Sequence, residues 1–212
     1  MRQRFFSVLC AFALVLSASA AEQVIKLSAP NLQRTATLMQ SLRQRQSVRE
    51  FSPRALSQAD LSDLLWAANG INRAESGKRT APSAMNRQEV DIYVLFPEGA
   101  YLYDASRSEL TLVVAEDLRS MVAGRQTSVK EAPLCLLLVS NGEKFQGRGG
   151  ERDLIMRGVD VGIVSQNISL FCAAAGLATV PRGSMELEQL RQALGLSSDQ
   201  VPMLNHPVGY PK

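Results

Sequence analysis

The chain has 212 residues, of which 23 are basic and 20 acidic, and a formal net charge of +3 at pH 7. Charges this close to balance argue against a general nucleic-acid binder, which needs a clear basic excess. The single histidine, His206, cannot build a zinc site by itself, and the cysteines and acidic residues show no metal-ligand spacing.

The N-terminus has the pattern of a secretory signal peptide. Two arginines precede an apolar run at 5–16 that is short for a bilayer span, and Ala18-Ser19-Ala20 provides the small residues of a cleavage site. Cleavage after Ala20 would leave 212 − 20 = 192 residues, which fits one domain at 32–212 behind a polar lead-in at 21–31. We therefore expect export, to the periplasm or beyond. An uncleaved membrane anchor is the alternative.

The first half of the remaining chain indicates two helices, a long loop and three strands. Ser57 can cap the second helix, and Gly70 is expected to end it in the left-handed conformation. The loop that follows, 71–88, is long for a compact domain, and long loops are often functional. The expected helices are 32–44, 57–70 and a weak one at 117–124, and the expected strands are 90–96, 99–103 and 110–114, with a hairpin turn at 97–99.

The stretch Asp153–Leu177 organises the second half. Its apolar residues go nearly all round a helix, which predicts burial, and Arg157 and Asp160 argue against a membrane span. Because Gly158 and Gly162 would let another backbone approach, we expect this helix in the core and against a partner chain. The alternative is the core helix of a monomer.

Around the central helix we expect strands at 133–140, 178–181 and 201–208, a glycine-rich linker at 142–150, and a helix at 185–194 that Ser184 caps and Gly195 closes. Strands and helices mix without regular βαβ alternation, which favours an α+β fold.

The remaining reactive side chains fit structural roles best. Cys135 and Cys172 lie in apolar surroundings and are interpreted as small buried hydrophobes, although an exported location would permit a disulfide between them. The sequence has no GxSxG or HExxH motif, so a hydrolytic triad would have to be built on His206 alone. A core or surface histidine is the better interpretation.

A basic cluster is the best candidate for ligand binding. Arg43, Arg45 and Arg49 lie near the hydroxyl of Ser47, and guanidinium groups suit a phosphate, although a solvated charged turn explains the cluster equally simply. The loop 81–88 adds amides and hydroxyls that can bond the edge of a heterocycle, unless it is an ordinary polar loop.

Five segments in order resemble the nitroreductase family of flavin enzymes, and in particular its short form related to peptide-thiazoline oxidases. They are RQSVREF at 45–51, LLWAANGINR at 64–73, GKRTAPSAMNRQ at 77–88, DVGIVSQNISLFCAAAGLATVPRGSM at 160–185 and HPVGYPK at 206–212. The resemblance implies an α+β fold with a mainly antiparallel sheet flanked by helices. It also implies a homodimer with the long helix at its centre and FMN in each of two sites at the subunit interface.

The resemblance assigns the first group of site residues. Arg45 and Ser47 match the residues that hold the phosphate side of FMN. Arg49 matches a basic residue near the flavin pyrimidine, where a cation lowers the cost of placing electrons on the ring. Relatives commonly continue past Gly-Tyr-Pro with basic residues that reach the phosphate, and here Lys212 or Arg43 is expected to substitute.

A second group comes from two further segments. The loop motif falls on Pro82, Ser83, Ala84 and Asn86, with Asn86 bonding the flavin ring and Ser83 expected from the opposite subunit. Pro181, Arg182 and Gly183 match the segment over the other flavin face, where the Gly183 N–H approaches N5. Many relatives have an acid or a small apolar residue in place of Arg182, so the local electrostatics differ.

The resemblance implies an exported FMN-dependent oxidoreductase. It would work by a ping-pong route, moving hydride or electrons through flavin N5 to a small organic acceptor, and no protein residue is expected as acid or base. NAD(P)H is not expected outside the cytoplasm, so the donor stays open. One alternative is a flavin-dependent dehydrogenase or oxidase of the thiazoline-oxidising kind, with Lys78, Tyr101 or Tyr103 as base. The other is a flavin-binding dimer without turnover.

Overall fold

A computed structural model describes residues 23–147 and 149–212, so the predicted signal peptide at 1–20 lies outside the described residues. Its main feature is a seven-stranded sheet in the order β1-β6-β5-β4-β7-β9-β8, antiparallel at every pairing. The strands are β1 (Val24–Lys26), β4 (Val90–Phe96), β5 (Gly99–Asp104), β6 (Glu109–Val114), β7 (Leu134–Asn141), β8 (Ala178–Thr179) and β9 (Gln200–Gly209).

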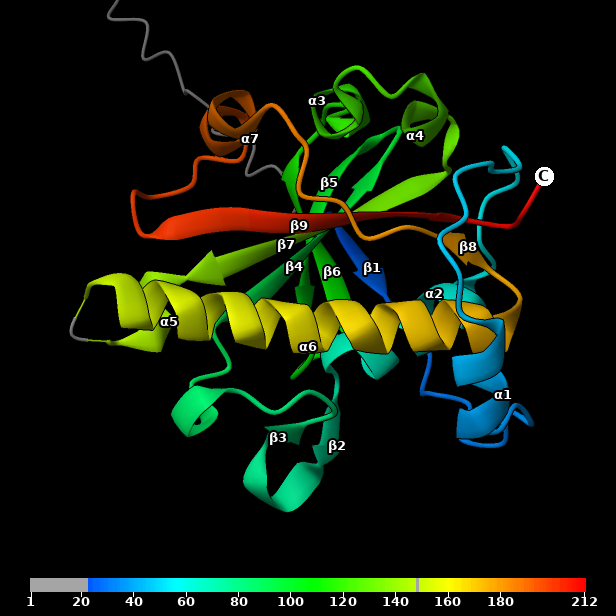
Figure 1. Ribbon diagram of the computed structural model, residues 1–212, viewed down its shortest axis with the longest axis horizontal. Coiled ribbons are helices and arrows are strands. Elements are labelled where there is room, and N and C mark those ends of the chain that lie inside the picture. Colours follow the sequence, from blue (N-terminus) through cyan, green and yellow to red (C-terminus); the bar gives the residue numbers. More distant parts are fainter. Residues whose placement is uncertain (1–22, 148) are drawn as a thin grey trace, which may run out of the picture.

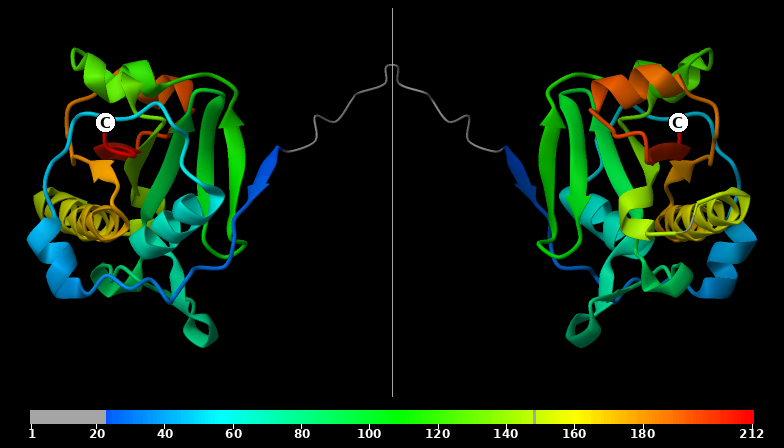
Figure 2. Two further views of the ribbon diagram at one scale, coloured as in Figure 1. Left: turned by 90° about the vertical axis from the view of Figure 1, so that its right-hand side faces the viewer. Right: turned by 90° about the vertical axis from the view of Figure 1, so that its left-hand side faces the viewer.

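Helices cover both faces of this sheet (Figures 1 and 2). The long helix α6 and helix α2 pack on one face, and the short helices α3, α4 and α7 lie over the other. The expected α+β fold with an antiparallel sheet between helices is confirmed. The helices are α1 (Leu38–Gln44), α2 (Gln58–Asn69), α3 (Arg119–Ala123), α4 (Thr127–Glu131), α5 (Gly142–Phe145), α6 (Glu151–Ala175) and α7 (Leu187–Ala193).

Strand β7 is the centre of the core. All eight of its residues are buried, as its unbroken apolar run predicts. Leu136 and Leu138 face the α2–α6 side, while Cys135, Leu137 and Val139 face the other side, so one strand supplies two hydrophobic cores.

Helix α6 forms where the sequence predicts a helix, but it is not buried all round. Val161, Val164, Ile168 and Cys172 face the sheet, whereas Ile155 and Val159 are about half exposed, at 56% and 47%. The helix is long and apolar enough to cross a membrane, yet here it lies across the sheet (Figure 1). The buried face is the core helix that was expected, and the exposed apolar face is free for another contact.

Three helix ends differ from the sequence prediction. Helix α1 begins at Leu38 rather than 32, because Thr37 and Gln40 form a capping box there. Gly70 ends α2 in an extended conformation, and glycine is needed because a Cβ would lie 2.5 Å from Trp66. Helix α7 begins at Leu187 without a side-chain cap, since Ser184 is part of the preceding segment.

The predicted long loop at 71–88 has structure of its own. It contains a hairpin of β2 (Ile71–Arg73) and β3 (Lys78–Arg79), with the 3₁₀ turn η1 (Ala74–Ser76) between them, and a second turn η2 (Ala84–Asn86). The sequence prediction also missed β1 in the lead-in, α4, and α5 in the glycine-rich linker. These elements are too short to show a periodic pattern.

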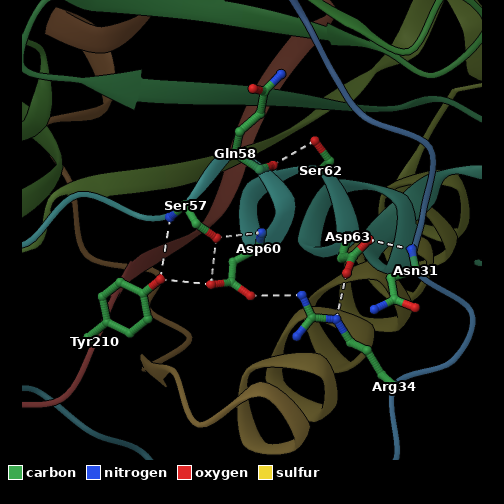
Figure 3. A network of polar contacts seen from close by, with 8 residues as sticks. All are labelled: Asn31, Arg34, Ser57, Gln58, Asp60, Ser62, Asp63 and Tyr210. Atoms are coloured by element: carbon green, nitrogen blue, oxygen red, sulfur yellow. Dashed lines mark hydrogen bonds and ion pairs between the residues drawn. The ribbon is translucent and has the colours of Figure 1, made fainter.

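Arg34, which precedes α1, and Tyr210, near the C-terminus, both contact the start of α2 (Figure 3). Arg34 bonds Asp60 at 2.7 Å and Asp63 at 2.5 Å, and the Tyr210 hydroxyl donates to Asp60 at 2.7 Å. Burial alone would raise the pKa of Asp60, but hydrogen bonds from Arg34, Tyr210 and Ser57 outweigh it and lower this pKa. The network holds the last residues of the chain close to the 45–51 segment.

Candidate flavin site

The Arg45–Phe51 segment leaves α1 as extended chain. The N–H of Val48 donates to the carbonyl of Thr179 at 2.9 Å, and the buried Phe51 bridges to Pro211. Arg45, Ser47 and Arg49 are all exposed. That these three residues act together on one ligand stays a prediction.

These arginines carry charge that the fold does not neutralise. No ion pair among the described residues uses Arg45 or Arg49. The exposed Lys212 follows Pro211, so a further cation lies close to the same segment. A cavity of about 320 Å³ opens between Gln46, Val48 and the C-terminal end of α6, and neither Arg45 nor Arg49 lines it. An anionic ligand would be the natural partner of these cations.

Arg182 points into the protein rather than toward this surface. It is 7% exposed, and its guanidinium donates to the carbonyls of Val122 and Ala123 and to the side chains of Asn205 and Gln126, at 2.9 to 3.2 Å. It thus caps the C-terminus of α3, where a cation is favoured by the helix dipole. The unusual arginine in the family segment therefore has a structural role.

The surface beside Arg182 consists mainly of backbone. Pro181 and Gly183 are exposed, and a cavity of about 400 Å³ opens between 123–126 and 182–186. Burial and the charge of Arg49 lower the pKa of Arg182, and the hydrogen bond from the Val48 N–H to the Thr179 carbonyl joins the arginine segment to the strand before Pro181. The Arg45–Arg49 and Pro181–Gly183 segments thus border one region of a single chain.

The Pro82–Asn86 loop lies elsewhere, beside the N-terminal half of α6. The N–H of Ala84 donates to Asp160 Oδ2 at 2.8 Å, and Ser83 Oγ accepts from the N–H of Gln88 at 2.8 Å. Pro82 and Asn86 are exposed, with the amide oxygen of Asn86 3.3 Å from Gln88 Nε2. The loop therefore presents polar edges to solvent.

One chain does not bring the two halves of the expected site together. The loop contacts α6 at Asp160, whereas the arginine segment borders the cavity at Gly176. Sixteen residues of helix separate these positions, or about 24 Å at the α-helical rise. The expectation that Ser83 serves the opposite subunit stays a prediction.

The family of the chain follows from comparison with known proteins. A sequence model described as the Nitroreductase family matches residues 42–210, which is most of the chain. The chain belongs to the nitroreductase family. As a member of the nitroreductase family it is an oxidoreductase, which confirms the resemblance found in the sequence.

Two proteins illustrate how close the nitroreductase relatives are. A protein named "putative nitroreductase" from Methanocaldococcus jannaschii is 31% identical over 174 residues, covering 78% of this chain and 86% of its own. The crystal structure of another protein so named, from Ralstonia eutropha, superposes with a TM-score of 0.85 at 38% identity and covers 91% of both chains. The nitroreductase fold and the long helix are therefore shared along nearly the whole length.

The residues weighed for other chemistries have structural roles in this nitroreductase fold. His206 is fully buried; its Nε2 lies 2.8 Å from Ser165 Oγ and its Nδ1 lies 3.2 Å from Thr179 Oγ1. Because Thr179 Oγ1 donates to the Pro207 carbonyl, Nδ1 carries the proton. Burial lowers the pKa of His206 to about 3, so it is a neutral core residue.

The candidate bases of a thiazoline-type reaction are poorly placed. Burial raises the pKa of Tyr103 to about 12 and also raises the pKa of Tyr101, so neither phenol ionises readily near neutral pH. Lys78 is exposed on the β2–β3 hairpin. The geometry gives this alternative no support.

The cysteines are free and buried, as expected for small core residues. Burial raises the pKa of both thiols, that of Cys135 to about 12. Within residues 23–147 and 149–212, no cluster of His, Cys, Asp or Glu side chains could hold a metal ion.

Sequence reasoning missed one buried pair. Glu89, directly before β4, is 0% exposed, and Asp160 of α6 is 2% exposed. Both positions looked unremarkable in the sequence, where Asp160 served only as an argument against a membrane span. No local pattern could reveal the pair, because it joins residues far apart in the chain.

Proposed function

We propose that this oxidoreductase depends on FMN, works as a homodimer and passes electrons to a small organic acceptor outside the cytoplasm. The observation that carries the proposal is the row of exposed Arg45, Ser47 and Arg49 without an ion-pair partner among the described residues. Exposed guanidinium groups fit a phosphate-bearing ligand. FMN would supply the redox chemistry, and the protein would bind and orient it.

The residues divide by what they offer such a ligand. Arg45 and Ser47 would hold the phosphate, with Lys212 or Arg43 as a further cation. Arg49, near the Pro181–Gly183 segment, would favour added negative charge on the ring. The backbone of Pro181 and Gly183 would cover one face of the ring, because Arg182 itself is engaged with α3.

The homodimer is supported by the exposed face of α6. A Cβ built on Gly158 or Gly162 would meet no atom within 4 Å, and Ile155 and Val159 are exposed on the same helix. Two copies of α6 that cross antiparallel about a two-fold axis would form an isologous interface. Such a crossing would carry Pro82, Ser83, Ala84 and Asn86 of one copy to the arginine segment of the other.

Export rests on the sequence pattern at 1–20 and is part of the proposal. Because nicotinamide donors are not expected outside the cytoplasm, another reductant would serve there. The purified mature chain, residues 21–212, should therefore be tested with several donors.

The visible spectrum tests the flavin proposal. Purified protein should be yellow or should take up FMN in a titration, and the colour should bleach with a donor and return with an acceptor. Flavin that no donor bleaches would indicate a binding protein without turnover. Colourless protein that does not bind FMN would refute the proposal.

A charge deletion tests the site. Arg45→Ala removes one charge-assisted hydrogen bond to the phosphate and should cost about 1.5–3 kcal/mol, or about ten- to a hundredfold in Kd. The matched control is Arg107→Ala on the β5–β6 turn, which should leave FMN affinity unchanged in a fluorescence titration. Equal affinity in both variants would contradict the assignment.

Substitution of two valines, one at a time, tests the proposed dimer. Val159→Glu places a charge on the exposed face of α6 and should convert the dimer to a monomer in light scattering. Val113→Glu makes the same change on β6, where the valine is 39% exposed, and should not alter the mass. A monomer in the unmodified protein would overturn this part of the proposal.

A further inference from the structure

The buried carboxyl groups of Glu89 and Asp160 lie against each other at the N-terminal half of α6. Both side chains are almost fully buried, and their carboxyl groups are within hydrogen-bonding reach. Apart from the N–H of Glu89 itself, no N–H or O–H group of the described residues donates to either carboxyl oxygen of Glu89. A proton on one carboxyl group, donated to the other, is therefore the bond that this pair can make.

The same Asp160 holds the loop that follows the β2–β3 hairpin. Its Oδ2 accepts the N–H of Ala84 at 2.8 Å. The next two residues, Met85 and Asn86, have φ of +51° and +56°, and Gln88 has φ of +52°. Left-handed backbone costs roughly 1–2 kcal/mol for each non-glycine residue. Contacts such as the one to Asp160 must therefore hold the loop in this conformation.

The basic side chains near the pair have other partners and do not neutralise two carboxylates, so one proton can remain shared between Glu89 and Asp160. Arg157, one turn earlier on α6, favours the ionised form, but it also donates to Ser140 and to the Asp199 carbonyl. Lys144 of α5 is paired with Asp91. Arg87, at the end of the loop, bonds Gln146 through Nη1, and its buried Nε has no partner.

We propose that Glu89 and Asp160 share one proton and form a latch that fixes the Pro82–Asn86 loop on α6, and that loss of this proton loosens the loop. The significance of the loop for ligand binding rests on the proposed function. Glu89 and Asp160 are positioning residues, because they act through the loop.

Loss of the shared proton would affect the loop directly through Glu89. Without the proton two negative charges would be buried side by side, and burial together with Asp160 raises the pKa of Glu89 to about 7. The simplest relief is movement of Glu89 toward solvent. Glu89 follows Gln88 directly, so its movement would pull on the strained turn and on the contact between Ala84 and Asp160.

Amide hydrogen exchange of the flavin-free protein tests the latch without relying on FMN. After correction for the intrinsic pH dependence of exchange, protection of peptides covering 82–88 should fall by about tenfold per unit as pH rises from 5 to 7, and it should level off above pH 7, where Glu89 is already ionised in the closed loop. Peptides from β7 should keep their protection. Equal protection of 82–88 at pH 6 and pH 8.5 would overturn the proposal.

Two glutamate variants sharpen the test. Glu89→Gln can donate an amide N–H to Asp160 at any pH, so its loop should stay protected at pH 8.5. Glu98→Gln, on the exposed β4–β5 turn, should behave like the unmodified protein. If Glu89→Gln does not fold, the pH series of the unmodified protein still decides.

FMN binding separates the latch from the proposed function. In the unmodified protein the Kd for FMN should rise at least several-fold between pH 6 and pH 8.5, and in Glu89→Gln it should change less. Protein that shows the pH-dependent exchange but binds no FMN would retain the latch and refute the flavin function. Protein that binds FMN but whose loop is insensitive to pH would refute the latch and retain the flavin function.

Discussion

Two buried polar clusters touch α6, and they differ in how their hydrogen bonds are satisfied. His206 and Ser165 form one, in which each ring nitrogen has a partner. Glu89 and Asp160 form the other, in which no described residue besides Glu89 itself donates to the glutamate oxygens. Satisfied polar groups stiffen a core, whereas a buried group that needs a proton to complete its bonding couples the fold to pH. The first cluster therefore stiffens the core, and the second makes the fold sensitive to pH.

The largest expected effect is on the pH dependence of the free energy of unfolding. In the unmodified protein, the contributions of the two clusters to this dependence oppose each other. Glu89, usually near 4.5, has its pKa raised to about 7, so its contribution to stability is lost as pH rises from 4.5 to 7. His206, usually near 6.5, has its pKa lowered to about 3, so its contribution is lost as pH falls from 6.5 to 3. Between pH 4.5 and 6.5 the two slopes, each about 1.4 kcal/mol per unit, oppose one another.

In the Glu89→Gln variant, the contribution of His206 to the pH dependence of the free energy of unfolding should no longer be opposed. Relative to the unmodified protein, its free energy of unfolding should rise by about 2–3 kcal/mol from pH 4.5 to 6.5, measured by urea denaturation. Glu98→Gln serves as the control and should show no relative change. A constant difference between Glu89→Gln and the unmodified protein would mean that Glu89 titrates as it does in an unfolded chain.

A smaller effect on stability is expected from disrupting the His206–Ser165 cluster. His206→Leu leaves the Ser165 hydroxyl without its partner and should cost about 1–3 kcal/mol at pH 7. The double variant with Ser165→Ala should cost less than the sum of the two single changes, because no orphaned group remains. Strict additivity in urea unfolding would show that the two side chains are not coupled.

The smallest effect concerns the strain of the loop that Asp160 holds. Met85 is 72% exposed with φ of +51°, so Met85→Gly should be more stable than Met85→Ala by about 0.5–1 kcal/mol. At an ordinary helical position the order would be reversed. Thermal unfolding of the two variants compares them directly, and a more stable alanine variant would argue against a left-handed Met85.

Long periodic or apolar stretches made much of the fold predictable. The apolar run at 133–140 predicts a buried strand, which the structure has at Leu134–Asn141, and α6 lies within two residues of its expected ends. The long loop at 71–88 was not resolved into a hairpin, because its strands have two or three residues and no alternation. The end of α2 depended on the position of Trp66 against Gly70, which composition does not reveal.

The sequence places Arg45, Ser47 and Arg49 in one short segment, and the structure shows that all three are exposed. The burial of Arg182 under α3 and the pairing of Glu89 with Asp160 join distant segments, so neither could be read from the sequence. The roles of the expected flavin residues stay a prediction.

The two free thiols have a practical consequence. Cys135 and Cys172 are buried within the described residues, and burial keeps both protonated near neutral pH. Protonated, enclosed thiols react slowly with alkylating reagents. A single cysteine placed at an exposed position such as Glu98 or Met85 would then be the preferred point of attachment for a fluorophore or spin label, without removal of either native residue. Distances between two labelled copies could follow the association of subunits in solution.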